Sequence, residues 1–198
     1  WLFGVLQGDL GRSMVDNAPV ARAIALALPV TLQITLMALA IALAIGIPLG
    51  VIAATRRGGL ADAAATFTGL SSISIPGFWV AILLIYAFAL KVSWFPSSGF
   101  VRWHEDWLAS LHHSFLPALA LSLRPLGIFM RLVRSSMLEV LKSDYVRTAR
   151  AKGLGERAVI LGHGLRTSLI PLVTVLGVEF AALLGNVVVI DTIFGIPG

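Results

Sequence analysis

Two ionisable side chains, Arg124 and Glu179, lie inside long runs of apolar residues, and Asn186 places an amide in the second of these runs. Charges in such surroundings are costly, and in membrane proteins they usually face the interior of a helix bundle or a wet cavity. One interpretation places Arg124, Glu179 and Asn186 along a pathway for a solute, with the two charges as a pair. The other interpretation is structural: Arg124 steadies a bend at Pro125, and Glu179 and Asn186 bond neighbouring helices. The residue types leave both interpretations open.

Prolines and glycines interrupt one of these apolar runs and two earlier ones. Pro48, Pro76 and Pro125 each remove a backbone hydrogen-bond donor and permit a kink in a helix. Gly46 and Gly50 have the G-x3-G spacing that permits two helices to approach closely. With Pro76 added, the candidate pathway residues are Arg124, Glu179, Asn186 and Pro76.

The sequence gives little support to other chemistry. The neighbours His112 and His113 have no third ligand nearby, and the chain contains no cysteine, so we predict no metal site. The stretch Gly8-Asp9-Leu10-Gly11-Arg12-Ser13 lacks the spacing and the lysine of a phosphate-binding loop. We therefore expect neither a bound cofactor nor an enzymatic activity in this chain.

The elements that must position the polar residues are membrane-spanning helices. Of the 198 residues 58% are apolar and 13% are charged, against about 45–50% and about 25% in soluble domains. The stretches Ala23 to Thr55 and Ala63 to Leu90 contain no charged residue, and each exceeds the roughly 20 residues that a helix needs to cross a bilayer. The predicted fold is all-α, a polytopic transmembrane bundle with about four spans, at 23–54, 63–90, 115–138 and 169–190.

The distribution of positive charge predicts an orientation. If 55–62 is cytoplasmic then 139–168 is cytoplasmic too, and that side carries ten Lys and Arg residues against four on the other, in line with the positive-inside tendency. The segments 1–22, 91–114 and 191–198 are then external. The net charge of +5 thus indicates orientation in a lipid bilayer and not binding to nucleic acid. An external 1–22 requires an earlier span, so we expect an interior piece of a longer membrane protein.

The most specific pattern lies in the predicted cytoplasmic segment 139–168. Ser143-Asp144 can N-cap a short helix beginning at Tyr145, and Gly153 can end it in a left-handed turn. A second helical run is expected over 156–165. Three residues share one face of the short helix by their spacing: Tyr145, Val146 and Ala149. A two-turn helix is marginal alone, so the segment is either a solvated basic loop or a docking helix whose small-residue face fits a partner's groove.

Specific motifs run through this segment and beyond it. The segment reads Asp144-Tyr145-Val146-Arg147-Thr148-Ala149-Arg150-Ala151-Lys152-Gly153-Leu154, followed by His163-Gly164-Leu165-Arg166 and Ile170-Pro171. It resembles the cytoplasmic loop of binding-protein-dependent ABC importer permeases, whose general pattern E-A-A-x3-G-x9-I-x-L-P it keeps only at Ala149, Gly153 and Leu165. The R-T-A-R-A-K-G form with H-x-L-R is similar to the dipeptide, oligopeptide and nickel branch of that family.

The likeness extends over most of the chain. It includes Gly8 through Ser13, Gly46 through Val51, Ile75 through Trp79, and Leu184 through Gly198. Gly77, Asp191 and Ile196 depart from the residues that the branch leads us to expect. These departures leave the substrate open.

The resemblance implies a six-span permease subunit, of which this chain would hold four spans. It also implies that the loop forms a coupling helix in a cleft of a separate ATPase subunit. The candidate coupling residues are Tyr145, Val146, Thr148, Ala149, Ala151, Lys152, Gly153, Leu154, His163 and Leu165.

The implied partners are a homologous permease subunit, as heterodimer or homodimer, two ATP-binding subunits that hold ATP and Mg, and an extracytoplasmic substrate-binding protein. The implied location is the cytoplasmic (inner) membrane of a bacterium or archaeon. The implied function is ATP-driven import of di- or oligopeptides, with nickel or another small solute as the alternative.

Two other classes of protein compete with this interpretation. A secondary transporter or channel predicts internal inverted repeats around broken helices, and no repeat is visible across the four runs. A passive membrane scaffold would leave the short helix and Glu179 without explanation.

Overall fold

The computed structural model describes residues 10–14 and 17–198 of the chain. The elements within these residues are helices, together with one isolated bridge between Arg12 and Pro19, which confirms the predicted all-α fold. In chain order they are α2 (Val20–Thr55), α3 (Leu60–Ser74), α4 (Gly77–Leu84), η1 (Ile85–Lys91), α5 (Trp107–Val140), α6 (Asp144–Ala151), α7 (Glu156–Ala158), η2 (Val159–Leu165), α8 (Arg166–Ser168) and α9 (Ile170–Phe194). The motif that starts at Gly8 lies partly outside the described residues.

Three helices of the described chain, α2, α5 and α9, are long and apolar enough to cross a membrane. They contain three of the four predicted spans. A fourth crossing exists if α3 is combined with the helical stretch 77–91 as one bent span. Length and composition therefore give three or four crossings, in agreement with the predicted multi-pass bundle.

The run predicted as one span at 63–90 is a broken helix. The axes on either side of the break, in α3 and in the stretch that begins with α4, differ by 102°. Ile75 has an extended backbone, with φ −83° and ψ 127°, which is the conformation that a following proline favours. Pro76 also lacks the N–H that would continue the helical ladder. The sequence allows a kink at Pro76, and the structure has a sharp turn there.

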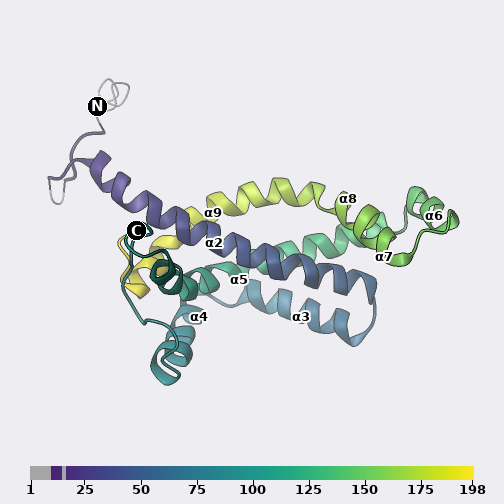
Figure 1. Cartoon of the computed structure of the whole chain (residues 1–198), viewed down its shortest axis with the longest axis horizontal. Helices are drawn as coiled ribbons and strands as arrows, with labels where there is room; N and C mark the ends of the chain where they lie inside the picture. The colour runs from purple at the N-terminus through teal and green to yellow at the C-terminus, as the bar shows by residue number, and fades with distance from the viewer. Residues whose placement is uncertain (1–9, 15–16) are drawn as a thin grey trace.

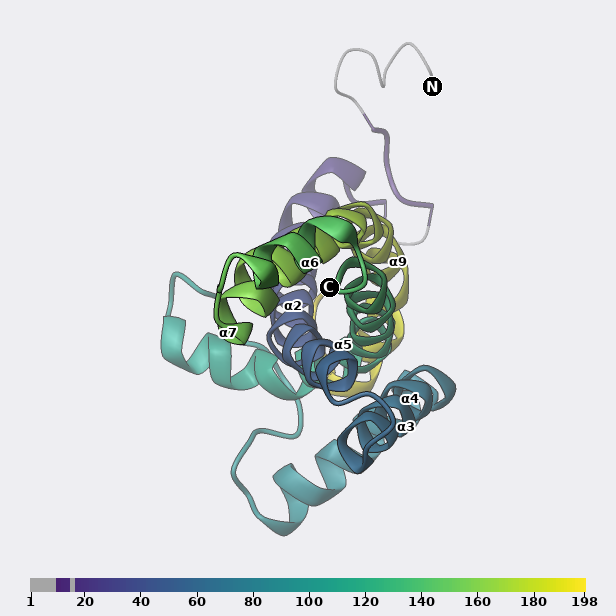
Figure 2. The ribbon, with the colours of Figure 1, turned by 90° about the vertical axis from the view of Figure 1, so that its right-hand side faces the viewer.

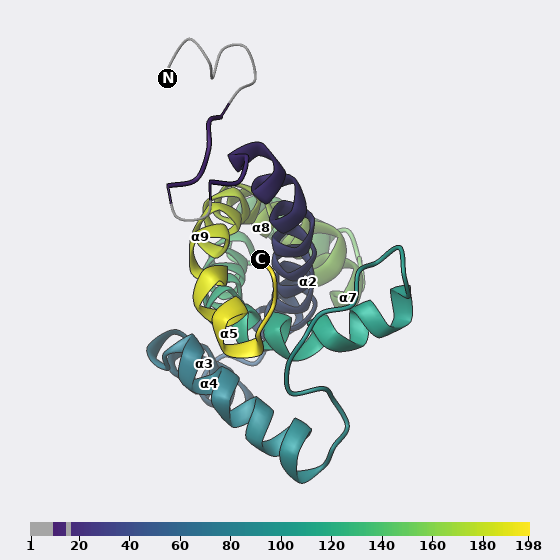
Figure 3. The ribbon, with the colours of Figure 1, turned by 90° about the vertical axis from the view of Figure 1, so that its left-hand side faces the viewer.

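Helix α5 is the centre of the bundle and packs against α2, α3, α4 and α9. Figure 1 shows α2, α5 and α9 along the long axis of the molecule, with α4 turned away from that axis. Views along the axis from either end show α3 and α4 together on one side (Figures 2 and 3). The side chains of Phe129, Met130, Val133 and Met137 on α5 are fully buried. The core therefore lies along α5, and the outer faces of its neighbours remain open.

Two glycines let α2 approach α5 closely, as the G-x3-G spacing predicts. A Cβ atom at Gly50 would lie 2.7 Å from the carbonyl oxygen of Met130 and 2.8 Å from Cβ of Val133. A Cβ atom at Gly46 would lie 3.0 Å from the carbonyl oxygen of Leu126. Backbone atoms of a central helix cannot yield as a flexible side chain can, so these positions require glycine.

We expect Gly50→Ala to lower the free energy of unfolding by about 1–3 kcal/mol, the usual cost of overpacking a close contact. The measurement is the thermal unfolding midpoint of the purified protein in detergent. Gly177→Ala is the matched control, because Gly177 also lies in a long helix and a Cβ there would meet nothing within 4 Å. Equal midpoints for Gly50→Ala and the unsubstituted chain would show that the helices separate without cost.

The two ends of the bundle differ in character. The loop between α2 and α3 lies at the same end as α6 and α7, and the C-terminus lies at the opposite end (Figure 1).

His112 and His113, near the start of α5, hold the loop that precedes this helix. Nε2 of His112 lies 2.8 Å from the carbonyl oxygen of Trp94, and Nδ1 of His113 lies 3.2 Å from the carbonyl oxygen of Gly99. Among the described residues no group of three side chains could hold a metal ion. The histidine pair thus has a structural explanation.

Candidate functional site

A cavity of about 620 Å³ lies at the break between α3 and α4, facing α5 and α9. Its lining includes three of the four predicted pathway residues: Pro76, Arg124 and Asn186. The non-helical backbone around Ile75 and Pro76 lines it as well. At membrane depth, irregular backbone is tolerated where it lines a water-filled cavity or is buried in protein. The break therefore brings polar backbone to a place where a continuous helix would offer side chains alone.

The fourth predicted residue, Glu179, does not line this cavity and pairs with Arg124. Nη1 of Arg124 lies 3.4 Å from Oε2 of Glu179, which joins α5 to α9. The Glu179 side chain is 7% exposed and that of Arg124 is 52% exposed. The distance exceeds the roughly 2.7–2.9 Å of a strong charge-assisted hydrogen bond, so the contact is loose. The arginine retains donors that are free to turn toward the cavity.

Asn186 lies two helical turns beyond Glu179 on α9, which places both residues on the same side of that helix. Its amide nitrogen donates to the carbonyl oxygen of Ala182, at 2.8 Å, on the same helix. Asn186 is exposed and lines the cavity, and it makes no bond to a neighbouring helix within the described residues. Of the two locations that the sequence allows, Asn186 therefore lies in the wall of the cavity and not in a contact between helices.

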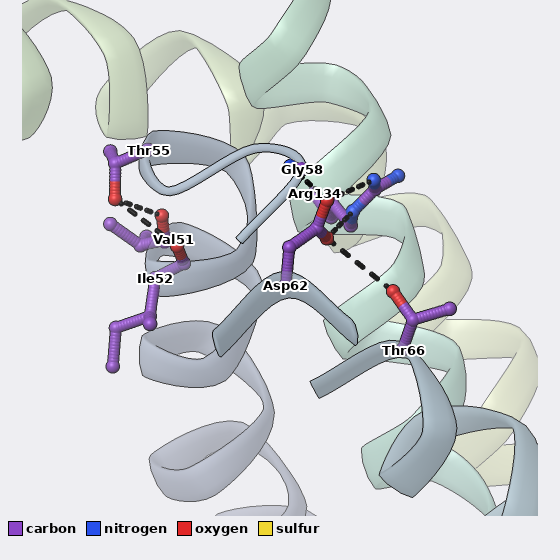
Figure 4. A network of polar contacts seen from close by, with 7 residues as sticks. All are labelled: Val51, Ile52, Thr55, Gly58, Asp62, Thr66 and Arg134. Atoms are coloured by element: carbon purple, nitrogen blue, oxygen red, sulfur yellow. Dashed lines mark hydrogen bonds and ion pairs between the residues drawn. The ribbon is translucent and has the colours of Figure 1, made fainter. Parts of the chain in front are cut away.

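Sequence reasoning missed a second ion pair, between Asp62 on α3 and Arg134 on α5. Nε and Nη2 of Arg134 donate to the two carboxylate oxygens of Asp62, at 2.7 and 3.0 Å. Asp62 also accepts the N–H of Gly58 at 3.0 Å and the hydroxyl of Thr66 at 3.4 Å (Figure 4). The sequence places both residues on the cytoplasmic side but gives no sign that they meet. The only signal in the sequence is that both residues are predicted at the same end of the bundle, which does not select this pair from the other charges there.

The predicted short helix in the loop 139–168 is α6, and it is packed against its own chain. Val146 and Ala149 are buried with Val159 of η2 in a small cluster. The sequence leaves open whether this helix is a solvated loop or docks its small-residue face into a partner; in the structure Val159 packs against Val146 and Ala149, and Ala151 is exposed. The predicted side-chain cap does not form: the Ser143 side chain accepts no N–H of the helix, and its hydroxyl donates to the carbonyl oxygen of Val140.

Gly153 forms a left-handed turn just after α6, as the sequence predicts, with φ +81°. In this left-handed conformation an L side chain is strained. The turn leads to Glu156, whose carboxylate receives two hydrogen bonds from Arg150, at 2.7 and 3.1 Å. These bonds lower the pKa of Glu156 below its usual value. The pair ties α6 to α7 across the turn.

The outer side of α6 carries a shallow cavity of about 340 Å³. Six candidate coupling residues line it: Tyr145, Thr148, Ala149, Lys152, Leu154 and His163. Tyr145 and Leu154 are 44% and 42% exposed, and the Tyr145 hydroxyl donates to that of Thr167 at 3.2 Å. Ala151 is exposed beside them, and Leu165 packs against the main core. The structure thus brings together most of the candidate coupling residues at one end of the bundle.

Known proteins resemble this chain over its whole length. A peptide transport system permease protein of Brucella abortus is 42% identical over 198 residues. The glutathione transport system permease protein GsiC is 39% identical in Pectobacterium atrosepticum and 38% identical in Escherichia coli K12, again over 198 residues. Each match covers all of this chain, which spans 63% of the Brucella protein and 62% of the two GsiC proteins.

The profile of one membrane-protein family matches residues 46–198. This range contains the broken helix, the cavity with Arg124 and Asn186, and the whole of α6. The chain belongs to the family of binding-protein-dependent transport system inner membrane components.

Proposed function

We propose that this chain is the membrane-spanning permease subunit of an ATP-driven importer and forms half of the pathway through which di- or oligopeptides cross the membrane. The single observation that carries the proposal is the cavity at the break between α3 and α4, whose lining includes polar groups. It combines the non-helical backbone at Ile75 and Pro76, the half-exposed Arg124 and the amide of Asn186 within a bundle of otherwise apolar helices.

The chemistry of this cavity suits a small zwitterion. A peptide carries an amine at one end and a carboxylate at the other; Arg124 lines the cavity with a half-exposed guanidinium, and Glu179, which does not line the cavity, holds that guanidinium from α9. Arginine binds carboxylates through parallel hydrogen bonds. A loose pair separated by 3.4 Å can exchange its internal contact for contacts with such a solute. The names of the relatives, for peptides and for glutathione, favour cargo of this class.

Coupling to ATP hydrolysis is assigned to α6 and the turn at Gly153. This short helix is held to the bundle by Val146, Ala149 and Val159, so a force on its outer side would reach α5 and α9. Its exposed residues, among them Tyr145, Lys152 and Leu154, would contact a separate ATPase subunit. This chain would itself hydrolyse no ATP.

The remaining partners are a second, homologous permease subunit, two ATP-binding subunits and an external substrate-binding protein. The open outer faces of α2, α4 and α9 are suited to lipid and to the second permease. The end that carries α6 and the loop 55–62 would be cytoplasmic in a bacterial inner membrane, because the positive charges concentrate there.

Affinity purification of the intact protein from its native membrane tests this assignment. We expect a homologous permease to co-purify in an amount equal to this chain, with ATP-binding subunits in twice that amount, and the purified complex to hydrolyse ATP. A chain that purifies alone, with no ATPase activity in any detergent that keeps it folded, would contradict the proposed function.

A further inference from the structure

A second cavity continues the first one toward the end that carries α6. Its volume is about 490 Å³, and it lies between α3, α5 and α9. Ile73 lines both cavities. On α5, Arg131 lines the second cavity seven residues after Arg124 lines the first. Seven residues are two helical turns, a rise of about 10 Å, so both guanidinium groups project from one side of the helix.

The three arginines along these cavities differ in their partners. Arg124 has Glu179, and Arg134 has both carboxylate oxygens of Asp62 (Figure 4). Arg131 is exposed and makes no hydrogen bond or ion pair within residues 10–14 and 17–198. Its planar fork of donors is therefore open to an anion that enters the second cavity.

The positive-inside tendency alone would be satisfied by any cation at this end of the bundle. It does not require a guanidinium in a cavity that shares a wall with the proposed pathway. Nearby acids also fail to neutralise Arg131, because Asp62 and Glu179 are engaged by the other two arginines. A carboxylate that leaves Arg124 toward the α6 end would meet Arg131 as the next uncompensated positive charge.

Resting on the proposed function, we propose that Arg131 is a second carboxylate-binding residue of the pathway. It receives the C-terminal carboxylate of a peptide after that group leaves the level of Arg124 and Glu179. Arg124 is partly neutralised by Glu179, whereas Arg131 has no acidic partner in the part of the chain that the structure describes. This difference favours movement of the peptide carboxylate from Arg124 toward Arg131 along α5. The site thereby selects cargo that carries a free carboxylate.

The test uses the complete reconstituted complex in vesicles of phosphatidylglycerol and phosphatidylcholine, with trialanine and trialanine amide as probes. Each probe is supplied at a concentration that saturates the binding protein. Every uptake rate is divided by that of the unsubstituted complex with the same probe, so that the preference of the binding protein cancels. Arg131→Gln, Arg131→Lys and Arg57→Gln are compared, since Arg57 is an exposed cation at the same end that lines neither cavity.

We expect Arg131→Gln to lower uptake of trialanine on the order of tenfold, the effect of losing a charge-assisted hydrogen bond, and to change uptake of the amide by less than about twofold. ATP hydrolysis stimulated by the loaded binding protein should persist. Arg131→Lys should be intermediate because it keeps the charge and loses the fork, and Arg57→Gln should affect neither probe.

Equal losses for both probes, or no loss with trialanine, would overturn the inference. The inference would also be overturned if the difference between the two probes in Arg131→Gln vanished in vesicles of phosphatidylcholine alone, because Arg131 would then bind an anionic lipid headgroup. Failure of the unsubstituted complex to take up either probe would contradict the proposed function itself, and with it this inference.

Discussion

Gly153→Val is expected to abolish the stimulation of ATP hydrolysis by cargo-loaded binding protein and to stop uptake, while the chain still inserts and assembles. Gly153 has φ +81°, a conformation that costs an L residue about 1–2 kcal/mol and a β-branched residue more. Each 1.4 kcal/mol is about a tenfold change in an equilibrium constant, so the population of the turn that positions α6 would fall about fivefold to thirtyfold relative to its alternatives, and further for valine. Bulk is not the cause, since a Cβ at Gly153 would meet nothing within 4 Å.

Gly155→Val is the matched control for this prediction. Gly155 is exposed, two residues away, and has φ −62° and ψ 147°, an extended conformation that valine adopts readily. ATPase rates are measured in reconstituted vesicles with and without loaded binding protein. Normal stimulation in Gly153→Val would show that this helix is a solvated loop with no role in coupling.

Reversing the charges of Arg124 and Glu179 one at a time is expected to reduce uptake about tenfold or more, and reversing both is expected to restore part of it. Glu179 is buried, and removing the partner of a buried charge costs about 3–5 kcal/mol; the half-exposed Arg124 places this pair toward the lower limit. Arg124→Glu would set two carboxylates against each other, and Glu179→Arg would set two guanidinium groups together. The double variant restores opposite signs across α5 and α9.

The measurement is peptide uptake at equal amounts of protein in the membrane, read as a double-mutant cycle. Recovery should be incomplete, because position 179 must accommodate a larger side chain. Arg22→Glu, at the exposed start of α2, controls for a change of charge alone. Identical uptake in the double variant and the worse single variant would show that the two residues act independently.

The sequence predicts the helical class and the number of apolar runs because composition and length decide both. It does not predict which proline breaks a helix. Pro48 and Pro125 lie inside the continuous helices α2 and α5, whereas Pro76 separates α3 from α4 by a turn of 102°. The first two lie in helices packed along much of their length, and Pro76 is followed by Gly77, which has no neighbour within 4 Å of its Cβ position. Packing therefore decides which proline breaks a helix, and the local sequence around each proline does not reveal that packing.

The candidate sites divide in the same way. The turn at Gly153 follows from a local preference, so the sequence predicts it. The burial of Ala149 under Val159 and the pairing of Asp62 with Arg134 depend on how distant segments meet, and no local pattern encodes them. The pairing of Arg124 with Glu179 is predicted only in part. The depth of the two residues in their spans suggests a pair, and the structure shows the 3.4 Å contact.

In the proposed function, this chain carries cargo through the membrane with energy from ATP. The most direct measurement is accumulation of a labelled peptide in vesicles that contain the complete complex, with binding protein on one side and ATP on the side of α6. Accumulation should require both and should be unchanged by ionophores that collapse proton and sodium gradients. Accumulation that proceeds without ATP and stops with the ionophores would identify a secondary transporter and contradict the account.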